Sequence, residues 1–378
     1  MKIAYLSPLP PERSGVADYS ALLLPALREH VEVEVVSRRS RARATGAAVP
    51  LYHVGNDAEV HGWIVEELQR RPGVVVLHDV VLHHLVVGLT LARGDRNGYL
   101  AAVERAGGAH ARKLAEEALA GGGEPPWETR PHELPLLEFV LDHATRVIVH
   151  SRHAEERVRA SGYEGPVQRI AMPAWPAPPS TPAELPRPAP FVVAALGKLN
   201  AAKRVPQLLH AFARVRDRVP GALLVLGEVD SRLNLDARLE ALGLERGRDV
   251  LEPGRIAERD LWALLARADV SVSLRWPTMG ETSGIAVRAL ALGRPLVVSD
   301  VGWFSELPDE VAARVAVDEW EVDLLAAVLE LLAGDERLRE RMGLSARAYA
   351  EAEHSLQRAA AAYAEALAHA VDLQEVLS

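Results

Sequence analysis

Short runs of apolar residues alternate with helical patterns along both halves of the chain. Runs rich in Val, Leu and Ile suit strands that are covered on both faces, and their alternation with helices is typical of a parallel sheet wrapped by helices. The expected strands are KIAYLS, VEVEVV, LYHVG, GVVVLHD and RVIVHS in the first half, and FVVAALG, ALLVLGE, DVLEPG, DVSVSL and PLVVSD in the second. The pattern therefore predicts two α/β domains of similar construction.

A proline-rich stretch separates the two halves, with eight prolines in the nineteen residues 172–190. No helix or central strand tolerates that density, because proline fixes φ and lacks a backbone donor. We expect an N-terminal domain over residues 1–172, a linker over 173–190 and a C-terminal domain over 191–356. The alanine-rich segment 357–378 is amphipathic and predicts a final helix that packs on a domain surface.

Residues 93–135 interrupt this rhythm with a charged, Gly- and Pro-containing segment. We expect two short charged helices and a loop, inserted into the N-terminal domain. The segment serves either as a solvated cover or as a lid on the side of an acceptor, since surface segments tolerate variation and also carry binding residues.

Composition limits the classes of function. The 378 residues are 49% hydrophobic and 25% charged, which is typical of globular chains, and no apolar run reaches membrane-spanning length. The start MKIAYLSPLP predicts a first strand rather than a signal peptide, and zero cysteines exclude disulfides and thiolate sites. A net charge of −9 argues against general nucleic-acid binding. These features favour the cytoplasm.

Four arginines follow the second expected strand, in the stretch SRRSRARA: Arg38, Arg39, Arg41 and Arg43. A solvated loop is the default interpretation. The alternative is peripheral contact with the inner face of a membrane or with a phosphorylated acceptor, since clustered arginines attract anionic surfaces.

Polar residues follow several of the expected strands, where open α/β sheets bind ligands. Asn56 follows LYHVG, and His78 and Asp79 end GVVVLHD. Lys198 and Lys203 lie five residues apart around the start of a helix, where positive charge is unfavourable unless an anion lies between them. Two surface lysines in a loop are the alternative.

The stretch GETSG begins another helix. Thr282, Ser283 and Gly284 present backbone N–H groups and little bulk, which suits a phosphate at the helix N-terminus. Glu281 carries the same sign of charge as phosphate, so we expect it to accept hydrogen bonds from hydroxyls instead. Helix capping with an exposed Glu281 is the alternative. Taken with the lysines, these residues indicate a sugar joined to a diphosphate.

These segments together resemble the family 4 retaining glycosyltransferases of the GT-B fold, in which two Rossmann-like, doubly wound domains face each other across a cleft. The resemblance covers nearly the whole chain. The segments that carry it are RSGVADYS, VVVLHD, VIVHSRHAEERV, LGKLNAAKR and GETSGIAVRALALGRPLVVSD.

The resemblance implies a role for each matching residue. Contacts to the donor diphosphate are implied for Gly15, Lys198, Lys203, Thr282, Ser283 and Gly284. Three catalytic residues are implied. Lys203 would neutralise the leaving diphosphate, and His78 and Glu281 would contact the transferred sugar. The final helix would return to the N-terminal domain.

One position departs from the family pattern. The family usually carries a second glutamate eight residues after the first, often in contact with the nucleotide ribose. Here that position is Ala289, or Arg288 if one residue is deleted. The ribose contact and the base are therefore left open. As the one charge in an apolar helix, Arg288 is expected in a structural ion pair.

The resemblance implies a retaining, metal-independent hexosyltransferase of carbohydrate biosynthesis. Its co-substrate would be a nucleotide sugar such as a UDP- or GDP-sugar, and its acceptor a glycan, lipid or small-molecule hydroxyl. A sugar phosphorylase, a nucleotide-sugar epimerase and a non-enzymatic sugar-binding module remain as alternatives. A dinucleotide-dependent dehydrogenase is disfavoured because PLPPERSG lacks GxGxxG. His83 and His84 are expected to be packing or surface residues rather than metal ligands.

Overall fold

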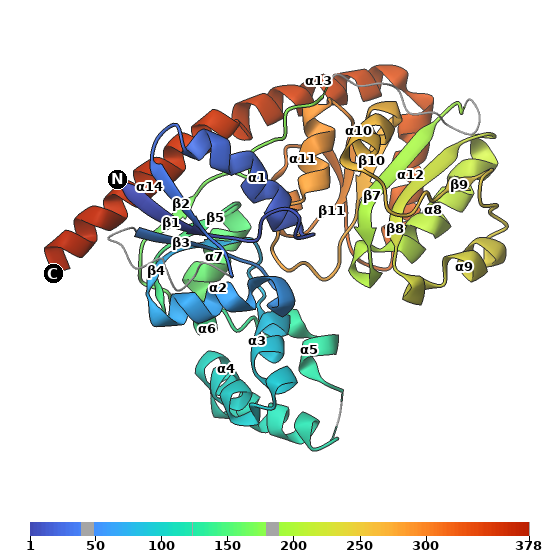
Figure 1. Ribbon diagram of the computed structural model, residues 1–378. Helices are drawn as coiled ribbons and strands as arrows, with labels where there is room; N and C mark the ends of the chain where they lie inside the picture. Colours follow the sequence, from blue (N-terminus) through green and yellow to red (C-terminus); the bar gives the residue numbers. More distant parts are fainter. Residues whose placement is uncertain (39–48, 123, 179–188, 378) are drawn as a thin grey trace. The chain divides into compact units, whose positions relative to one another are not determined.

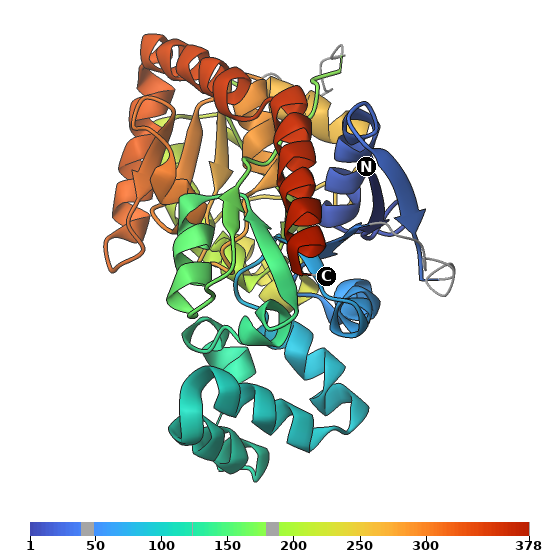
Figure 2. The same ribbon diagram turned by 90° about the vertical axis from the view of Figure 1, so that its left-hand side faces the viewer.

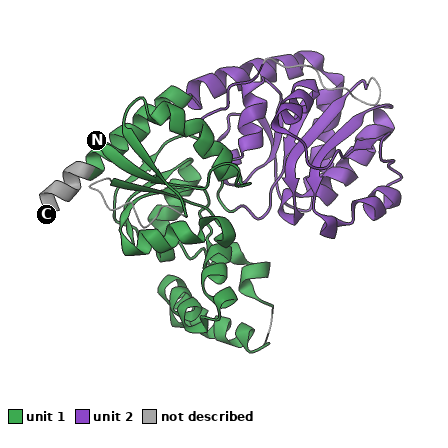
Figure 3. Ribbon diagram, in the orientation of Figure 1, with its two compact units in different colours: residues 1–172, 279–282, 356–378 green, residues 173–278, 283–355 purple. Residues whose placement is uncertain are grey.

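The computed structural model describes residues 1–38, 49–122, 124–178 and 189–377. The chain divides into two compact units, shown in different colours in Figure 3. Unit 1 comprises residues 1–172, 279–282 and 356–378, and unit 2 comprises residues 173–278 and 283–355.

Unit 1 contains a six-stranded sheet in its described residues, with the order β2-β1-β3-β4-β5-β6 and parallel pairing throughout (Figure 1). The strands are β1 (Lys2–Leu6), β2 (Glu32–Val36), β3 (Val49–Val54), β4 (Gly73–Leu77), β5 (Ala144–Val149) and β6 (Val167–Arg169). Strands β3 and β4 are buried along their whole length because helices cover both faces of the sheet.

The helices around this sheet begin at the capping residues that the sequence offers. The side chains of Ser14, Asp57 and Ser151 accept hydrogen bonds from backbone N–H groups in the first turns of α1, α2 and α7. The helices of unit 1 outside the insertion are α1 (Gly15–Leu27), α2 (Ala58–Arg70), α3 (His83–Leu89), α6 (Glu138–Leu141), α7 (Arg152–Ala160) and α14 (Leu356–Leu377).

Helix α14 runs alongside α1 within unit 1, as Figures 1 and 2 show from two sides. The hydroxyl groups of Tyr19 on α1 and Tyr363 on α14 form a buried hydrogen bond of 2.8 Å. Both side chains are fully buried, so the last helix closes one face of the sheet and contributes to the core of unit 1.

The inserted segment forms a small helical layer with its own core. It contains η2 (Leu91–Arg93), α4 (Arg96–Leu119), α5 (Pro126–Thr129) and η3 (Pro131–Glu133). A positive φ of 70° at Gly108 divides α4 into two helical parts, which confirms the expectation of two charged helices. The insertion is anchored to α3, because Tyr99 donates or accepts a hydrogen bond of 2.9 Å with His83 Nε2.

Unit 2 also contains a six-stranded parallel sheet, with the order β12-β11-β10-β7-β8-β9 among its described residues. The strands are β7 (Val192–Leu199), β8 (Leu223–Val229), β9 (Val250–Leu251), β10 (Val270–Ser273), β11 (Leu296–Ser299) and β12 (Ala312–Val315). The order reverses between β7 and β10, which makes the carboxyl ends of these two strands the topological switch point of the sheet.

Helices cover both faces of this second sheet. They are α8 (Val205–Arg218), α9 (Leu235–Ala241), α10 (Glu258–Arg267), α11 (Gly284–Ala291), α12 (Glu321–Gly334) and α13 (Glu336–Glu353). Short 3-10 helices are η4 (Ala201–Lys203), η5 (Ser231–Leu233) and η6 (Gly302–Glu306). The central core joins the strands to the apolar faces of α8 and α12, including Phe212 and Leu329.

All ten predicted strands are present, and the prediction of two doubly wound α/β sheets is confirmed. The sequence reading missed the edge strands β6 and β12, whose sequences are VQR and AARV. Both are too short and too weakly apolar to stand out, because edge strands need not be buried on both sides. Three of the four clustered arginines, Arg39, Arg41 and Arg43, lie outside the described residues.

Candidate functional site

A small cavity of about 70 Å³ opens at the switch point of the unit 2 sheet. We call it the lysine pocket. The residues used here to define it are Gly197, Lys198, Lys203, Ser273, Ser283 and Ile285. Lys198 lies near the carboxyl end of β7 and Ser273 ends β10, while Ser283 precedes α11. The structure therefore brings four of the predicted phosphate-binding residues together: Lys198, Lys203, Ser283 and, directly after it, Gly284.

A bulge that depends on glycine interrupts the pairing of β7 with β8 just before Lys198. Gly197 has a φ of +90°, and the pairing of β7 with β8 shifts between Ala195 and Lys198. The strands approach so closely that a Cβ on Gly227 would lie 2.6 Å from the backbone nitrogen of Gly197. Only glycine fits at both positions, because the first needs a left-handed conformation and the second leaves no room. The sequence pattern predicts the strand FVVAALG and places Lys198 directly after it, whereas β7 extends to Leu199 and includes Lys198.

Lys203 ends the 3-10 turn η4, which connects β7 to α8. The carbonyl of Ala202 in this turn accepts a hydrogen bond of 2.7 Å from the backbone N–H of Trp276. Trp276 belongs to the loop after β10, which leads toward α11. The hydrogen bond therefore holds two of the loops that carry predicted site residues together.

Ser283 is the N-cap of α11. Its Oγ accepts a hydrogen bond of 3.3 Å from Ala286 N–H and lies 3.4 Å from Ser273 Oγ. The capping interpretation thus holds for the side chain of Ser283. The cap satisfies Ala286 N–H, whereas the N–H groups of Gly284 and Ile285 at the start of α11 have no partner inside the helix, which is the feature that anions use at helix N-termini.

Glu281 and Thr282 belong to a short segment that is grouped with unit 1. Oε2 of Glu281 accepts a hydrogen bond of 2.9 Å from Met279 N–H, and the Met279 carbonyl accepts one of 2.7 Å from Val80 N–H. Val80 follows His78 by two residues, so the structure brings the Glu281 segment beside the predicted sugar-binding strand end. The Oγ1 of Thr282 is buried and has no hydrogen-bond partner within the described residues.

His78 lies in a buried cluster of aromatic and imidazole rings, which the sequence reading did not identify. Its Nε2 is 3.0 Å from His53 Nδ1, and the edge of Tyr19 faces its ring at 4.9 Å. His150 lies 5.1 Å away, between ring centroids. His53 lies on β3 and Tyr19 on α1, whereas His78 and His150 directly follow β4 and β5, so only the tertiary fold brings these residues together.

Burial keeps these imidazoles neutral. Desolvation lowers the pKa of His53 and of His78 well below the usual value, and the charge of His150 lowers both further. Burial also lowers the pKa of His61 to about 4, against the opposing effect of its hydrogen bond to the His53 carbonyl. At neutral pH, His78 therefore acts as a neutral hydrogen-bonding group rather than as a cation.

Gly15 is the first residue of α1 and is exposed. A Cβ at this position would meet nothing within 4 Å, so the fold itself does not require glycine there. The open space agrees with close approach of a ligand to the backbone, and the predicted phosphate contact of Gly15 stays a prediction.

Arg288 is buried, with 7% of its side chain exposed, and its guanidinium is 3.7 Å above the Trp175 ring. Its Nη2 donates to Glu258 Oε1 at 3.2 Å. The expected structural ion pair is therefore confirmed, with a cation–π contact added.

The histidine pair behaves as packing and surface residues. His83 is buried against Tyr99, and burial lowers its pKa to about 4. His84 is exposed, with Nδ1 3.1 Å from the amide nitrogen of Asn56. Among the described residues, no group of three or more His, Asp or Glu side chains is arranged to hold a metal ion. In the same part of the chain, no helix has the length and apolar character that crossing a membrane requires.

A second hollow of about 320 Å³ lies in the insertion. Apolar side chains such as Leu114 and Leu134 line it together with charged groups that include Arg130 and Glu133. Leu114 is about half exposed at this hollow.

The chain has the GT-B fold of glycosyltransferases, which consists of two doubly wound parallel sheets and is here accompanied by a pocket at the carboxyl ends of the strands of unit 2. Residues 180–349 match the family described as glycosyl transferases group 1. They contain the lysine pocket and all of α11.

The chain is similar to particular proteins of this class. The glycogen synthase of Mycobacterium tuberculosis is 28% identical over 186 residues, which are 48% of this chain and 44% of that protein. The chain thus spans less than half the length of this curated relative. The solved sucrose-phosphate synthase of Thermosynechococcus elongatus has a TM-score of 0.65 at 18% identity, covering 97% of this chain and 98% of its own. Anabaena HepE in complex with UDP and glucose has a TM-score of 0.62 at 18% identity, covering 98% and 100%.

Proposed function

We propose that the protein is a retaining glycosyltransferase that moves a hexose from a nucleoside diphosphate sugar to an acceptor hydroxyl. The observation that supports this most is the lysine pocket, where two ammonium groups and the first turn of α11 meet at the switch point of a doubly wound sheet. Such an arrangement favours the diphosphate of a nucleotide sugar. HepE, similar in fold, is solved with UDP and glucose, and we therefore take UDP-glucose as the first donor to test.

In the proposed reaction the bond from the sugar C1 to the donor phosphate oxygen breaks. The acceptor oxygen forms its bond to C1 on the same face, and its proton passes to the departing phosphate oxygen. Lys198 and Lys203 stabilise the charge that develops on the diphosphate, and the N–H groups of Ser283 and Gly284 add hydrogen bonds. Neutral His78 and the carboxylate of Glu281 orient sugar hydroxyls. The protein supplies charge stabilisation and position rather than a nucleophile, and no metal ion is part of the proposal.

We propose the insertion as the acceptor side of the reaction. The hollow beside Leu114 and Arg130 combines apolar and charged lining, which suits an acceptor with an apolar portion. The acceptor hydroxyl is the only chemical requirement for transfer, so the apolar portion sets preference rather than reactivity.

The test is release of nucleoside diphosphate from UDP- and GDP-sugars in the presence of hydroxyl acceptors. Lys203→Ala is expected to lower kcat by at least about 100-fold, because a developing charge loses its partner. Lys2→Ala is the matched control, since it removes the same charge from an exposed position at the start of β1. Equal losses in both variants, or no turnover of any nucleotide sugar, would overturn the proposal.

The products distinguish the alternatives. Transfer with retention gives a glycoside whose anomeric proton coupling matches that of the donor. Formation of a sugar 1-phosphate that depends on inorganic phosphate would indicate a phosphorylase, and an isomerised donor without acceptor would indicate an epimerase.

A further inference from the structure

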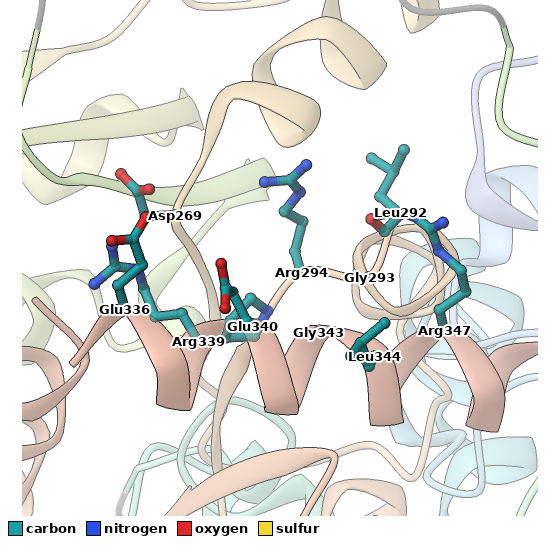
Figure 4. A pocket seen from close by; sticks show the side chains of 11 residues that line it. Asp269, Leu292, Gly293, Arg294, Glu336, Arg339, Glu340, Gly343, Leu344 and Arg347 are labelled. Atoms are coloured by element: carbon teal, nitrogen blue, oxygen red, sulfur yellow. Dashed lines mark hydrogen bonds between the residues drawn. The ribbon is translucent and has the colours of Figure 1, made fainter.

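A cavity of about 500 Å³ lies at the amino-terminal edge of the unit 2 sheet, the edge away from the lysine pocket. Asp269 precedes β10, and Arg294 and Pro295 precede β11. Helix α13 forms the opposite wall, along which Glu336, Arg339, Glu340 and Arg347 are placed (Figure 4). The volume lies within the range of small-molecule sites.

The wall formed by α13 is fixed by contact between two glycines. Gly293 has a φ of +65°, and a Cβ there would lie 2.9 Å from the Gly343 carbonyl oxygen. The turn after α11 therefore packs directly against the backbone of α13. Gly293 and Gly343 both line the cavity, so this backbone contact fixes the distance between its two walls.

Three guanidinium groups line the cavity, and each is held by a backbone carbonyl. Arg294 Nη1 donates to Ala268 O and Arg347 Nη2 to Leu292 O, both at 3.2 Å. Arg339 Nη1 donates to Leu332 O at 2.5 Å and to Ala333 O at 3.2 Å. One side of each group is thereby anchored, and donors remain on the other.

The lining also carries three carboxylates, yet no ion pair within 4.0 Å joins them to these arginines in the described part of the chain. The Oδ2 of Asp269 instead accepts a hydrogen bond of 2.8 Å from Val192 N–H. Burial lowers the pKa of Arg294, the charge of Asp269 raises it, and that of Arg347 lowers it again. Arg294 and Arg347 thus repel each other, which an anion between them would relieve.

Glu336 and Glu340 are exposed at the rim of the same cavity. A bare anion would be repelled by these carboxylates, whereas a ligand with hydroxyl groups would donate hydrogen bonds to them. We propose that this cavity binds a small hydroxylated phosphate monoester, of the sugar phosphate class, with its phosphate between Arg294 and Arg347 and its hydroxyls toward the two glutamates. The site is separate from the lysine pocket and independent of the proposed function.

The test is calorimetric titration of the full chain with ribose 5-phosphate, inorganic phosphate and ribose, each with and without saturating UDP. Ribose 5-phosphate is expected to bind more tightly than either fragment, and UDP is expected not to displace it. Arg347→Ala and Arg294→Gln are each expected to weaken binding about ten-fold or more, because a charge-assisted hydrogen bond is lost. Arg337→Ala is the control, since this exposed arginine lies on α13 but does not line the cavity.

Glu340→Ala separates the two halves of the ligand. The substitution is expected to weaken the binding of ribose 5-phosphate and to leave the affinity for inorganic phosphate unchanged or higher. Arg347 is exposed, so its variant tests the proposal even if the Arg294 variant fails to fold. Displacement by UDP, equal binding of phosphate and its ester, unchanged affinity in Arg347→Ala, or no binding would each overturn the proposal.

Discussion

Arg204 Nε donates hydrogen bonds of 3.1 Å to both carboxylate oxygens of Glu321, and its Nη2 donates to Oε2 as well. Glu321 begins α12 with 2% of its side chain exposed. Arg204 directly follows Lys203 and has a φ of +55°, a conformation that costs energy for a residue with a side chain. The ion pair therefore fixes the end of the turn that carries Lys203.

Glu321→Gln keeps the shape of the side chain and removes its charge, leaving the half-buried guanidinium without a counter-charge. We expect a loss of about 3 kcal/mol in the free energy of unfolding, and weaker UDP binding because Lys203 loses its support. Asp323→Asn on the same helix removes the exposed pair with Arg214 and is expected to cost less than about 1 kcal/mol. Urea unfolding measures the stability of both variants, and titration with UDP measures their affinity. Similar losses of stability and affinity in the two variants would refute the proposal that Glu321 supports the turn carrying Lys203.

Gly227→Ala is expected to destabilise the protein by about 1–3 kcal/mol and to weaken UDP binding, because the new methyl group overlaps the backbone of Gly197. Gly334→Ala is the matched control, since a Cβ at that position at the end of α12 meets nothing within 4 Å. Thermal unfolding of the two variants compares their stabilities, and titration with UDP compares their affinities. If the two variants unfold alike, the close approach of β7 and β8 does not shape the pocket.

Stability is expected to fall between pH 6.5 and 4. The folded-state pKa of His61 is lowered to about 4, and those of His53 and His78 are also lowered, so the unfolded chain binds more protons in this window. The stabilisation is complete above the unfolded pKa and disappears as pH falls through the folded one. For His61 the loss is about 3 kcal/mol.

His61→Asn keeps a donor for the His53 carbonyl and removes the titrating ring. The slope of unfolding free energy against pH should become shallower by up to about 1.4 kcal/mol per pH unit in this window. His30→Asn, at an exposed position, is the control. An unchanged slope for His61→Asn would contradict the prediction.

Arg288→Ala is expected to destabilise unit 2 by about 1–2 kcal/mol, since the contact with Trp175 and the bond to Glu258 are lost. UDP affinity should change less than about three-fold, because this side chain is engaged in packing and is not proposed to hold the ribose. Arg267→Ala, an exposed substitution on α10, is the control for stability. A large loss of UDP affinity with unchanged stability would assign Arg288 to the nucleotide instead.

The parallel strands were predictable because burial on both faces leaves an unbroken apolar run in the sequence. The edge strand β12, AARV, carries no such run, since one side of it has no neighbouring strand among the described residues. The glycine-dependent bulge that places Lys198 within β7 was also hidden, because it depends on a glycine in the neighbouring strand β8.

The position of a candidate residue was most predictable where it lies next to a helix start, as with Ser283, which caps α11. The cluster around His78 was not, because His53 lies on β3 while His78 and His150 directly follow β4 and β5, and each alone looks like an ordinary core position. The cavity between Arg294 and Arg347 was missed for the same reason, since α13 joins the sheet edge only in the tertiary fold.

The central claim is that a nucleoside diphosphate binds between Lys198, Lys203 and the first turn of α11. Calorimetric titration with UDP of the unaltered chain and of its Lys198→Ala, Lys203→Ala and Lys2→Ala variants tests it most directly. We expect binding in the unaltered chain and in Lys2→Ala, and about ten-fold or greater weakening in each of the other two. Equal UDP affinity in all four proteins would contradict the claim.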